Sequence, residues 1–92
     1  MNSKESSALV YVIIVTYNGL KWIDQCLQSL QESDYSHRVL IVDNCSTDNT
    51  VQHVKDKYPE VTFLIQDRNL GFGKANNIGL RYALTHGGEY FL

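Results

Sequence analysis

Three residues that follow apolar runs carry the chemistry of nucleoside recognition. Tyr17 comes after the run of residues 9–15, and its ring offers a flat face for stacking a base together with a hydroxyl group for hydrogen bonding. Asn18 can both donate and accept hydrogen bonds. Asp43 ends a second apolar run, and its acceptor-only carboxylate suits an imide N–H or ribose hydroxyls. These residue types predict a nucleoside site.

Each of these residues also has a purely structural explanation. Asp43 could order its own loop as an Asx turn, and Asn18 could serve only the turn that it forms with Gly19. Tyr17 could be an aromatic residue packed at a strand end. The residues alone leave both explanations open at every one of these positions.

A glycine-containing loop adds a candidate anion site. Gly71 and Gly73 allow close approach of the backbone, and Lys74 adds positive charge at the start of an expected helix, whose N-terminus attracts anions. The loop lacks the third glycine of a dinucleotide fingerprint and follows the third strand rather than the first, which argues against NAD. The structural alternative is a flexible loop with a solvated Lys74.

Other common site chemistries find no support in the sequence. The segment 43–54 lacks the central glycine and closing glutamate of an EF-hand calcium loop. We expect the three histidines to be surface or partly packed residues, because no carboxylate stands at ligand or triad spacing from them; they are His37, His53 and His86. Neither Cys26 nor Cys45 belongs to a Cys-x-x-Cys pair, so we expect two reduced cysteines.

Length and composition indicate one small globular domain. The chain has 92 residues, of which 43% are hydrophobic and 20% charged. Eight basic residues against ten acidic ones give a net charge of −2, which argues against nucleic acid as a partner. The longest apolar run, residues 8–15, is too short for a membrane-spanning helix, which needs about 20 residues.

Apolar runs separated by amphipathic stretches predict the element order βαβαβαβ. Runs rich in β-branched residues predict strands over residues 9–15, 39–42 and 61–65, and the apolar residues 90–92 are expected to start a fourth strand. A first helix is indicated by the spacing of Leu20, Ile23, Leu27 and Leu30. A second should start near residues 48–49 and stop before Pro59, and a third should span residues 74–85 and end at glycines 87–88.

This alternation predicts an α/β fold: a Rossmann-like parallel sheet with helices on both faces. The strand order we expect for such a sheet here is 3-2-1-4. In such sheets, ligands bind beyond the carboxyl ends of the strands. The segments that should meet there are residues 16–18, 43–44 and 66–67.

Three segments, taken together, resemble family 2 glycosyltransferases. They are residues 12–18 (VIIVTYN), 42–50 (VDNCSTDNT) and 69–79 (NLGFGKANNIG), and the third is most similar to the rhamnosyltransferase-like branch. The resemblance extends from about residue 10 to residue 92. It implies a GT-A fold and transfer of a sugar from a nucleoside diphosphate sugar to an acceptor, with inversion at the anomeric carbon.

The resemblance also implies a domain division and a residue set. Residues 1–8 would be a disordered tail, and residues 9–92 would be the N-terminal nucleotide-sugar-binding part of a glycosyltransferase domain, truncated in its fourth strand. Such enzymes build surface polysaccharides in the cytoplasm, including at the inner face of the membrane. The nucleotide-binding residues carried over from the family motifs are Thr16, Tyr17, Asn18, Asp43, Asn69, Gly71, Lys74 and Asn77.

The sequence departs from the family pattern in what it lacks. In the family, an Asp-x-Asp-type motif after the fourth strand holds Mg²⁺ or Mn²⁺, and the general base comes later still. We therefore expect the metal in the full-length enzyme but not on this chain, and no sugar transfer by this chain alone. An acceptor sugar or lipid-linked glycan would bind to the missing part, and the exposed strand edge would favour a homo-oligomer.

Two other hypotheses stay open. The chain could be a non-catalytic nucleotide-binding or assembly module. It could also be an unrelated doubly wound domain, such as a receiver or a flavin-binding domain, although a receiver needs an acidic cluster where this sequence has residues 16–18.

Overall fold

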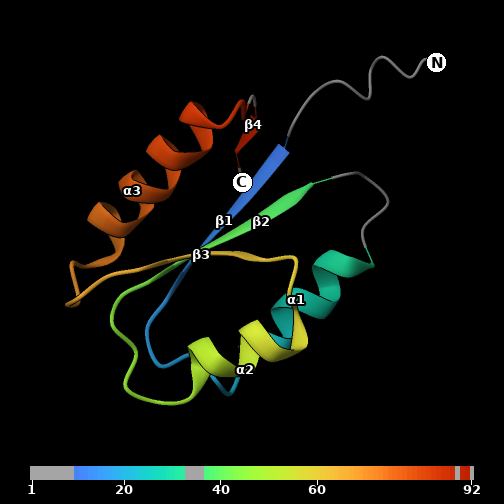
Figure 1. Cartoon of the computed structure of the whole chain (residues 1–92), viewed down its shortest axis with the longest axis vertical. Coiled ribbons are helices and arrows are strands. Elements are labelled where there is room, and N and C mark those ends of the chain that lie inside the picture. Colours follow the sequence, from blue (N-terminus) through green and yellow to red (C-terminus); the bar gives the residue numbers. More distant parts are fainter. Residues whose placement is uncertain (1–9, 33–36, 89, 92) are drawn as a thin grey trace.

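The computed structural model describes residues 10–32, 37–88 and 90–91, and its strands and helices alternate in the predicted order (Figure 1). The expected tail at residues 1–8 and Leu92 of the expected fourth strand lie outside the described residues. The elements are β1 (Val10–Thr16), α1 (Ile23–Gln31), β2 (Arg38–Asp43), α2 (Thr50–Lys57), β3 (Thr62–Ile65), α3 (Phe72–Thr85) and β4 (Tyr90–Phe91).

The strands form one parallel sheet in the order β3-β2-β1-β4, as predicted. Thr16 is level with Asp43 in the β1–β2 register, and Asp43 is level with Ile65 in the β2–β3 register. Backbone hydrogen bonds continue just past these ends, from Asn44 N–H to the Thr16 carbonyl at 2.8 Å and from Gln66 N–H to the Asp43 carbonyl at 2.9 Å. The three strands therefore end together, and we call this side the carboxyl edge.

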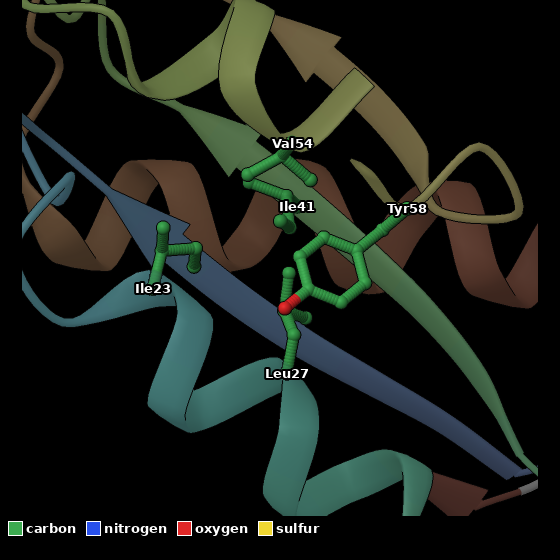
Figure 2. Packing of buried hydrophobic residues seen from close by; sticks show 5 residues of the cluster. All are labelled: Ile23, Leu27, Ile41, Val54 and Tyr58. Carbon is green, nitrogen blue, oxygen red and sulfur yellow. The ribbon is translucent and has the colours of Figure 1, made fainter. Parts of the chain in front are cut away.

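One face of the sheet carries the main apolar cluster. Figure 2 shows its side chains converging from α1, α2 and β2; they are Ile23, Leu27, Ile41, Val54 and Tyr58. Ile23 and Leu27 of α1 are four residues apart, and so are Val54 of α2 and Tyr58, which directly follows that helix; this spacing places two side chains on the same helix face. Burial of an apolar side chain of this size stabilises the fold by about 1.5–3 kcal/mol.

Helix α3 covers the opposite face of the sheet, and Figure 1 shows it on the other side of the strands from α1 and α2. Leu40 and Val42 alternate with Ile41 along β2 and face α3 at Gly79. A Cβ atom at Gly79 would lie 2.7 Å from Ile13 Cγ2 and 3.1 Å from Val42 Cγ2. The helix backbone therefore approaches the sheet closely because residue 79 has no side chain.

The first helix begins later than predicted. Leu20, expected to open its apolar face, is exposed and precedes the helix, which starts at Ile23. The Gly19 carbonyl accepts the N–H groups of Trp22 at 3.0 Å and Ile23 at 2.9 Å, so a turn intervenes. A Cβ at Gly19 would come within 2.8 Å of the Trp22 indole ring, which explains the glycine.

The third helix starts two residues before its predicted first residue, Lys74, and ends as predicted. Gly87 has the left-handed φ of 85°, and Gly88 N–H donates to the Ala83 carbonyl at 2.8 Å, which closes the helix in the manner typical of C-terminal glycines. Helix α3 has 14 residues, and within the described part of the chain no helix has the length and apolar character needed to cross a bilayer.

Candidate functional site

Three loops leave the sheet at the carboxyl edge. They are the β1–α1 loop (residues 17–22), the β2–α2 loop (residues 44–49) and the β3–α3 loop (residues 66–71). They start from strand ends that are level in the register, so the topology itself brings the predicted residues of the first two loops to one place.

Asp43 is fully buried and accepts hydrogen bonds from three donors of the chain itself. The hydroxyl groups of Thr16 and Ser46 each donate to Oδ1 at 2.6 Å, and the Ser46 N–H donates to Oδ2 at 2.8 Å. Such donors replace the water that a buried carboxylate loses. The loop-ordering role considered for Asp43 is therefore confirmed, whereas its contact with a nucleoside stays a prediction. Thr16 is equally buried, and its hydroxyl is occupied by Asp43.

Asn18 joins the first loop to the second. Its N–H donates to Ser46 Oγ at 2.8 Å, and its Oδ1 accepts the N–H groups of Thr47 at 2.7 Å and Asp48 at 3.1 Å. Asn18 and Cys45 have left-handed φ values of 52° and 67°. Asparagine tolerates this conformation better than most residues. We call the hydrogen bonds that Asn18 makes with Ser46, Thr47 and Asp48 the loop bridge.

Asp48 fixes the start of α2 and adds a further link to the first loop. Its Oδ1 accepts the N–H of Thr50 at 3.0 Å and also the Thr50 hydroxyl, and its Oδ2 accepts the Leu20 N–H at 3.3 Å. These donors, the Thr50 hydroxyl first, lower the pKa of the Asp48 carboxyl group. A carboxylate at this position also suits the positive end of the helix.

Asn44 connects the second loop to the third. Its side chain is almost fully buried, and its amide donates to the Gly71 carbonyl at 3.2 Å while its Oδ1 accepts the Leu70 N–H at 3.2 Å. Asn69 Oδ1 in turn accepts the Gly71 N–H at 2.8 Å, and Gly71 has a left-handed φ of 85°. Sequence reasoning places Asn44 beyond the strand end but misses this bridging role.

Six of the eight predicted residues are exposed, among them Tyr17, Lys74 and Asn77. Tyr17 is 50% exposed, so it is not a packed aromatic, and its two chain neighbours are both held by hydrogen bonds. Lys74 and Asn77 are exposed on the first two turns of α3. Among the described residues no hydrogen bond connects Lys74 or Asn77 to the loops at the carboxyl edge.

A cluster between α1 and α2 was not foreseen from the sequence. His53 is half-buried, as a partly packed histidine would be, and its Nε2 lies 2.9 Å from both carboxylate oxygens of Asp24. Tyr58 donates its hydroxyl to Asp24 at 3.0 Å, and Lys57 Nζ is 3.5 Å from the same oxygen. The hydrogen bond from His53 is the largest cause of a lowered Asp24 pKa, and burial raises the pKa of Tyr58. Residues 24 and 53 are too far apart in sequence for spacing to reveal the pair.

A hollow of about 590 Å³ lies at the opposite edge, where β2 and β3 begin. Leu30, Arg38 and Val61 are among the residues that line it. This hollow lies at the end of the sheet opposite to the carboxyl edge, so we do not assign it to nucleotide binding.

The side chains present do not fit a metal site. Across residues 10–32 and 37–88, no group of three histidine, cysteine, aspartate or glutamate side chains gathers in a way that could hold a metal ion. Asp43 is occupied by hydroxyl and amide donors rather than by other carboxylates.

The family model described as glycosyl transferase family 2 matches residues 11–91 of this chain. The chain belongs to glycosyltransferase family 2. This membership confirms the predicted family, and with it the α/β fold of the GT-A type.

The relatives of this family 2 chain include two bacterial glycosyltransferases. The chain is 38% identical over 79 residues to the poly(ribitol-phosphate) beta-N-acetylglucosaminyltransferase TarS of Staphylococcus aureus, covering 78% of this chain and 14% of TarS. It is 37% identical over 81 residues to the dTDP-rhamnosyl transferase RfbF of Shigella flexneri, covering 87% of this chain and 26% of RfbF. The chain thus spans about a quarter or less of these relatives.

Solved structures of the family agree with the fold. The crystal structure of Staphylococcus aureus TarS residues 1–349 matches with a TM-score of 0.79 at 35% identity, covering 90% of this chain and 26% of that one. The mannosyltransferase PcManGT of Pyrobaculum calidifontis, in complex with GDP-Man and Mn²⁺, matches with a TM-score of 0.68 at 32% identity, covering 80% of this chain and 24% of that one.

Proposed function

We propose that this family 2 chain is the donor-binding part of an inverting glycosyltransferase that moves a sugar from a nucleoside diphosphate sugar to an acceptor in surface polysaccharide synthesis. The observation that supports this most is the position of Tyr17, half exposed and directly beyond the strand end where Thr16 meets Asp43. This is the place where sheets of this type bind nucleotides.

In this proposal the ring of Tyr17 stacks on the base of the donor. Asp43 forms the floor of the nucleoside site together with Thr16, and its Oδ2, which accepts one hydrogen bond within the protein, keeps a lone pair for a donor on the base or ribose. Asn18, in the β1–α1 loop, holds this loop against the β2–α2 loop beside the nucleoside site.

The diphosphate lies toward α3. Lys74 supplies positive charge in the first turn of this helix. The N-cap residue is Gly71, so no side chain accepts hydrogen bonds from the first N–H groups of the helix, and these groups favour an anion. Asn69 and Gly71 fix the loop in front of it through their mutual hydrogen bond, and Asn77 follows one turn further along the helix.

A divalent metal is not assigned to this chain. The mannosyltransferase PcManGT was solved with Mn²⁺, and Mg²⁺ or Mn²⁺ is expected in a full-length enzyme of this kind. The described residues gather no ligand set for such an ion. We propose that metal binding, general-base catalysis and the binding of an acceptor sugar or lipid-linked glycan belong to parts of the enzyme beyond this chain, which then has no turnover by itself.

The proposal extends to location and assembly. The enzyme would work in the cytoplasm, at the inner face of the membrane where lipid-linked acceptors are presented. Both outer strands of the described sheet, β3 and β4, have an unpaired edge within the described residues, and pairing of such an edge with a second copy would give a homo-oligomer.

A thermal-shift titration of the 92-residue chain with dTDP, UDP and GDP tests the proposed site. Binding to the native state stabilises it by about 2.7 kcal/mol at a ligand concentration 100 times Kd, so at least one of these nucleotides should raise Tm. Tyr17→Ala should reduce the rise and Tyr17→Phe, which keeps the ring, should retain it. No rise with any of the three nucleotides would contradict the proposal.

A non-catalytic nucleotide-binding module is the second candidate, favoured by the lack of a metal-ligand cluster among the described residues. The intact mass of the natural gene product separates the two candidates. A longer product with an Asp-x-Asp-type motif after β4 supports the enzyme, and a product that ends at Leu92 supports the module.

A further inference from the structure

We propose that Ser46 is a positioning residue of the nucleotide site, which holds Tyr17 in place for stacking by way of Asn18. This inference rests on the proposed function, because it concerns how the stacking residue is presented. Ser46 is outside the set of residues predicted from the sequence to bind the nucleotide.

The Ser46 hydroxyl stands at the junction of two loops. It donates to Asp43 Oδ1 at 2.6 Å and accepts the N–H of Asn18 at 2.8 Å. Its proton and an acceptor lone pair are therefore both used within the protein, so its contribution to a ligand is indirect. One small hydroxyl group connects the buried carboxylate of β2 with the backbone of the β1–α1 loop.

Tyr17 lies between two residues that depend on this junction. On one side, the Thr16 hydroxyl donates to the same Asp43 oxygen as Ser46 does. On the other side, the Asn18 backbone donates to Ser46, while its side-chain oxygen accepts N–H groups from residues 47 and 48. The backbone of Tyr17 is thus held at both ends, although half of its side chain is exposed.

The backbone conformation shows that these hydrogen bonds oppose a local preference. Asn18 and Cys45 adopt left-handed φ values of 52° and 67°, a conformation that is unfavourable for residues with a side chain, less so for asparagine than for cysteine. Both lie next to the contacts of the loop bridge. Such conformations persist where the surroundings over-determine them, and a ring held in advance loses less conformational freedom when a base stacks on it.

The test measures Kd for dTDP, UDP and GDP by calorimetry on the 92-residue chain, using whichever nucleotide binds most tightly. Ser46→Ala removes the hydroxyl, Ser46→Thr keeps it, and Ser29→Ala on the exposed face of α1 is the matched control. We expect Ser46→Ala to weaken binding by about 3- to 10-fold, because the ring of Tyr17 is then held less firmly before the base stacks on it. Ser46→Thr and Ser29→Ala should leave Kd within about 2-fold of the wild-type value.

The same change in a Tyr17→Ala background separates positioning from general damage. If Ser46 acts through the ring, Ser46→Ala should weaken residual binding by less than about 2-fold once the ring is gone. If Ser46→Ala weakens nucleotide binding equally with and without the Tyr17 ring, the inference is overturned. It is also overturned if Ser46→Ala alone binds the nucleotide as tightly as the wild-type chain. Failure of the wild-type chain to bind any of the three nucleotides would instead overturn the proposed function, and this inference with it.

Amide hydrogen exchange on the wild-type chain covers the case in which Ser46→Ala does not fold. The N–H groups of Asn18, Thr47 and Asp48 all donate within the loop bridge, so they should exchange more slowly than the exposed amides of the neighbouring turn, and more slowly still with nucleotide bound. Exchange of these amides at the rate of an unprotected peptide would overturn the inference.

Discussion

The hydroxyl group of Thr16 donates a hydrogen bond of 2.6 Å to the carboxylate of Asp43, across the last residue pair of two adjacent parallel strands. Both side chains are fully buried. The carboxyl edge is therefore fixed by a polar contact beneath the loops, and not by apolar packing alone. Removal of one partner of such a buried hydrogen bond leaves the other without a partner and lowers the free energy of unfolding.

Removal of the Asp43 carboxylate should destabilise the chain more than removal of the Thr16 hydroxyl. Asp43→Ala leaves two hydroxyl groups and one N–H without their acceptor and should cost about 2–3 kcal/mol, whereas Thr16→Val should cost about 1–2 kcal/mol. Thr16→Ser keeps the donor and is the control. Urea unfolding of the four proteins measures the difference, and equal stability of wild type and Asp43→Ala would contradict it.

Two glycines of α3 should respond in opposite directions to the same substitution. Gly79→Ala forces a methyl group against Ile13 and Val42 and should destabilise the fold by about 1–3 kcal/mol. Gly73→Ala meets no atom within 4 Å and should stabilise it by about 0.5–1 kcal/mol through helix propensity. Thermal unfolding of both variants checks the pair, and a stabilising Gly79→Ala would show that the helix can move away from the sheet.

Stability should fall in acid through Asp24. The pKa of this carboxyl group is lowered below its ordinary value of 3.8, so its charged form stabilises the native state above that value, and the contribution is lost as the pH falls through the native pKa. The difference in free energy of unfolding between wild type and Asp24→Asn should therefore shrink between about pH 5 and pH 2. Asp67→Asn, an exposed carboxyl group outside the cluster, is the control, and a difference independent of pH would contradict the assignment.

Lys74 should contribute charge rather than shape to nucleotide binding. Reversal of its charge in Lys74→Glu should weaken the binding of dTDP, UDP or GDP by about 10-fold or more at low salt, and by less at high salt, since salt screens an exposed charge. Lys55→Glu, on the exposed face of α2, should have little effect. Calorimetric titrations at two ionic strengths measure this, and a salt-independent loss would indicate a steric cause.

The order of elements could be predicted from sequence because apolar periodicity is local. The run of Leu40, Ile41 and Val42 is apolar on both sides, and both sides are covered, by α3 on one and by the main cluster on the other. Boundaries were less accurate, since the turn at Gly19 takes Leu20 out of the helical stripe that its spacing suggested.

The contacts that shape the candidate site could not be predicted in the same way. Asn18 meets residues that are 28–30 positions away, and His53 meets Asp24 across 29 positions. These pairs exist only because parallel strands carry their loops to one edge and their helices to one face. Tyr17 and Asp43 could be placed at that edge from the strand pattern, but the hydrogen bonds from Ser46 to Asp43 span the left-handed residue Cys45, which no spacing rule reveals.

The contact between Trp22 and Gly19 makes the first loop observable by optical means. Trp22 is the one tryptophan of the chain, and its indole lies over the turn that leads from Tyr17 to α1 while 41% of the residue faces solvent. The wavelength of maximum fluorescence emission of Trp22, and the quenching of this fluorescence by iodide, therefore report on the environment of this turn. Movement of the loop can be followed in real time without a dye or an isotope.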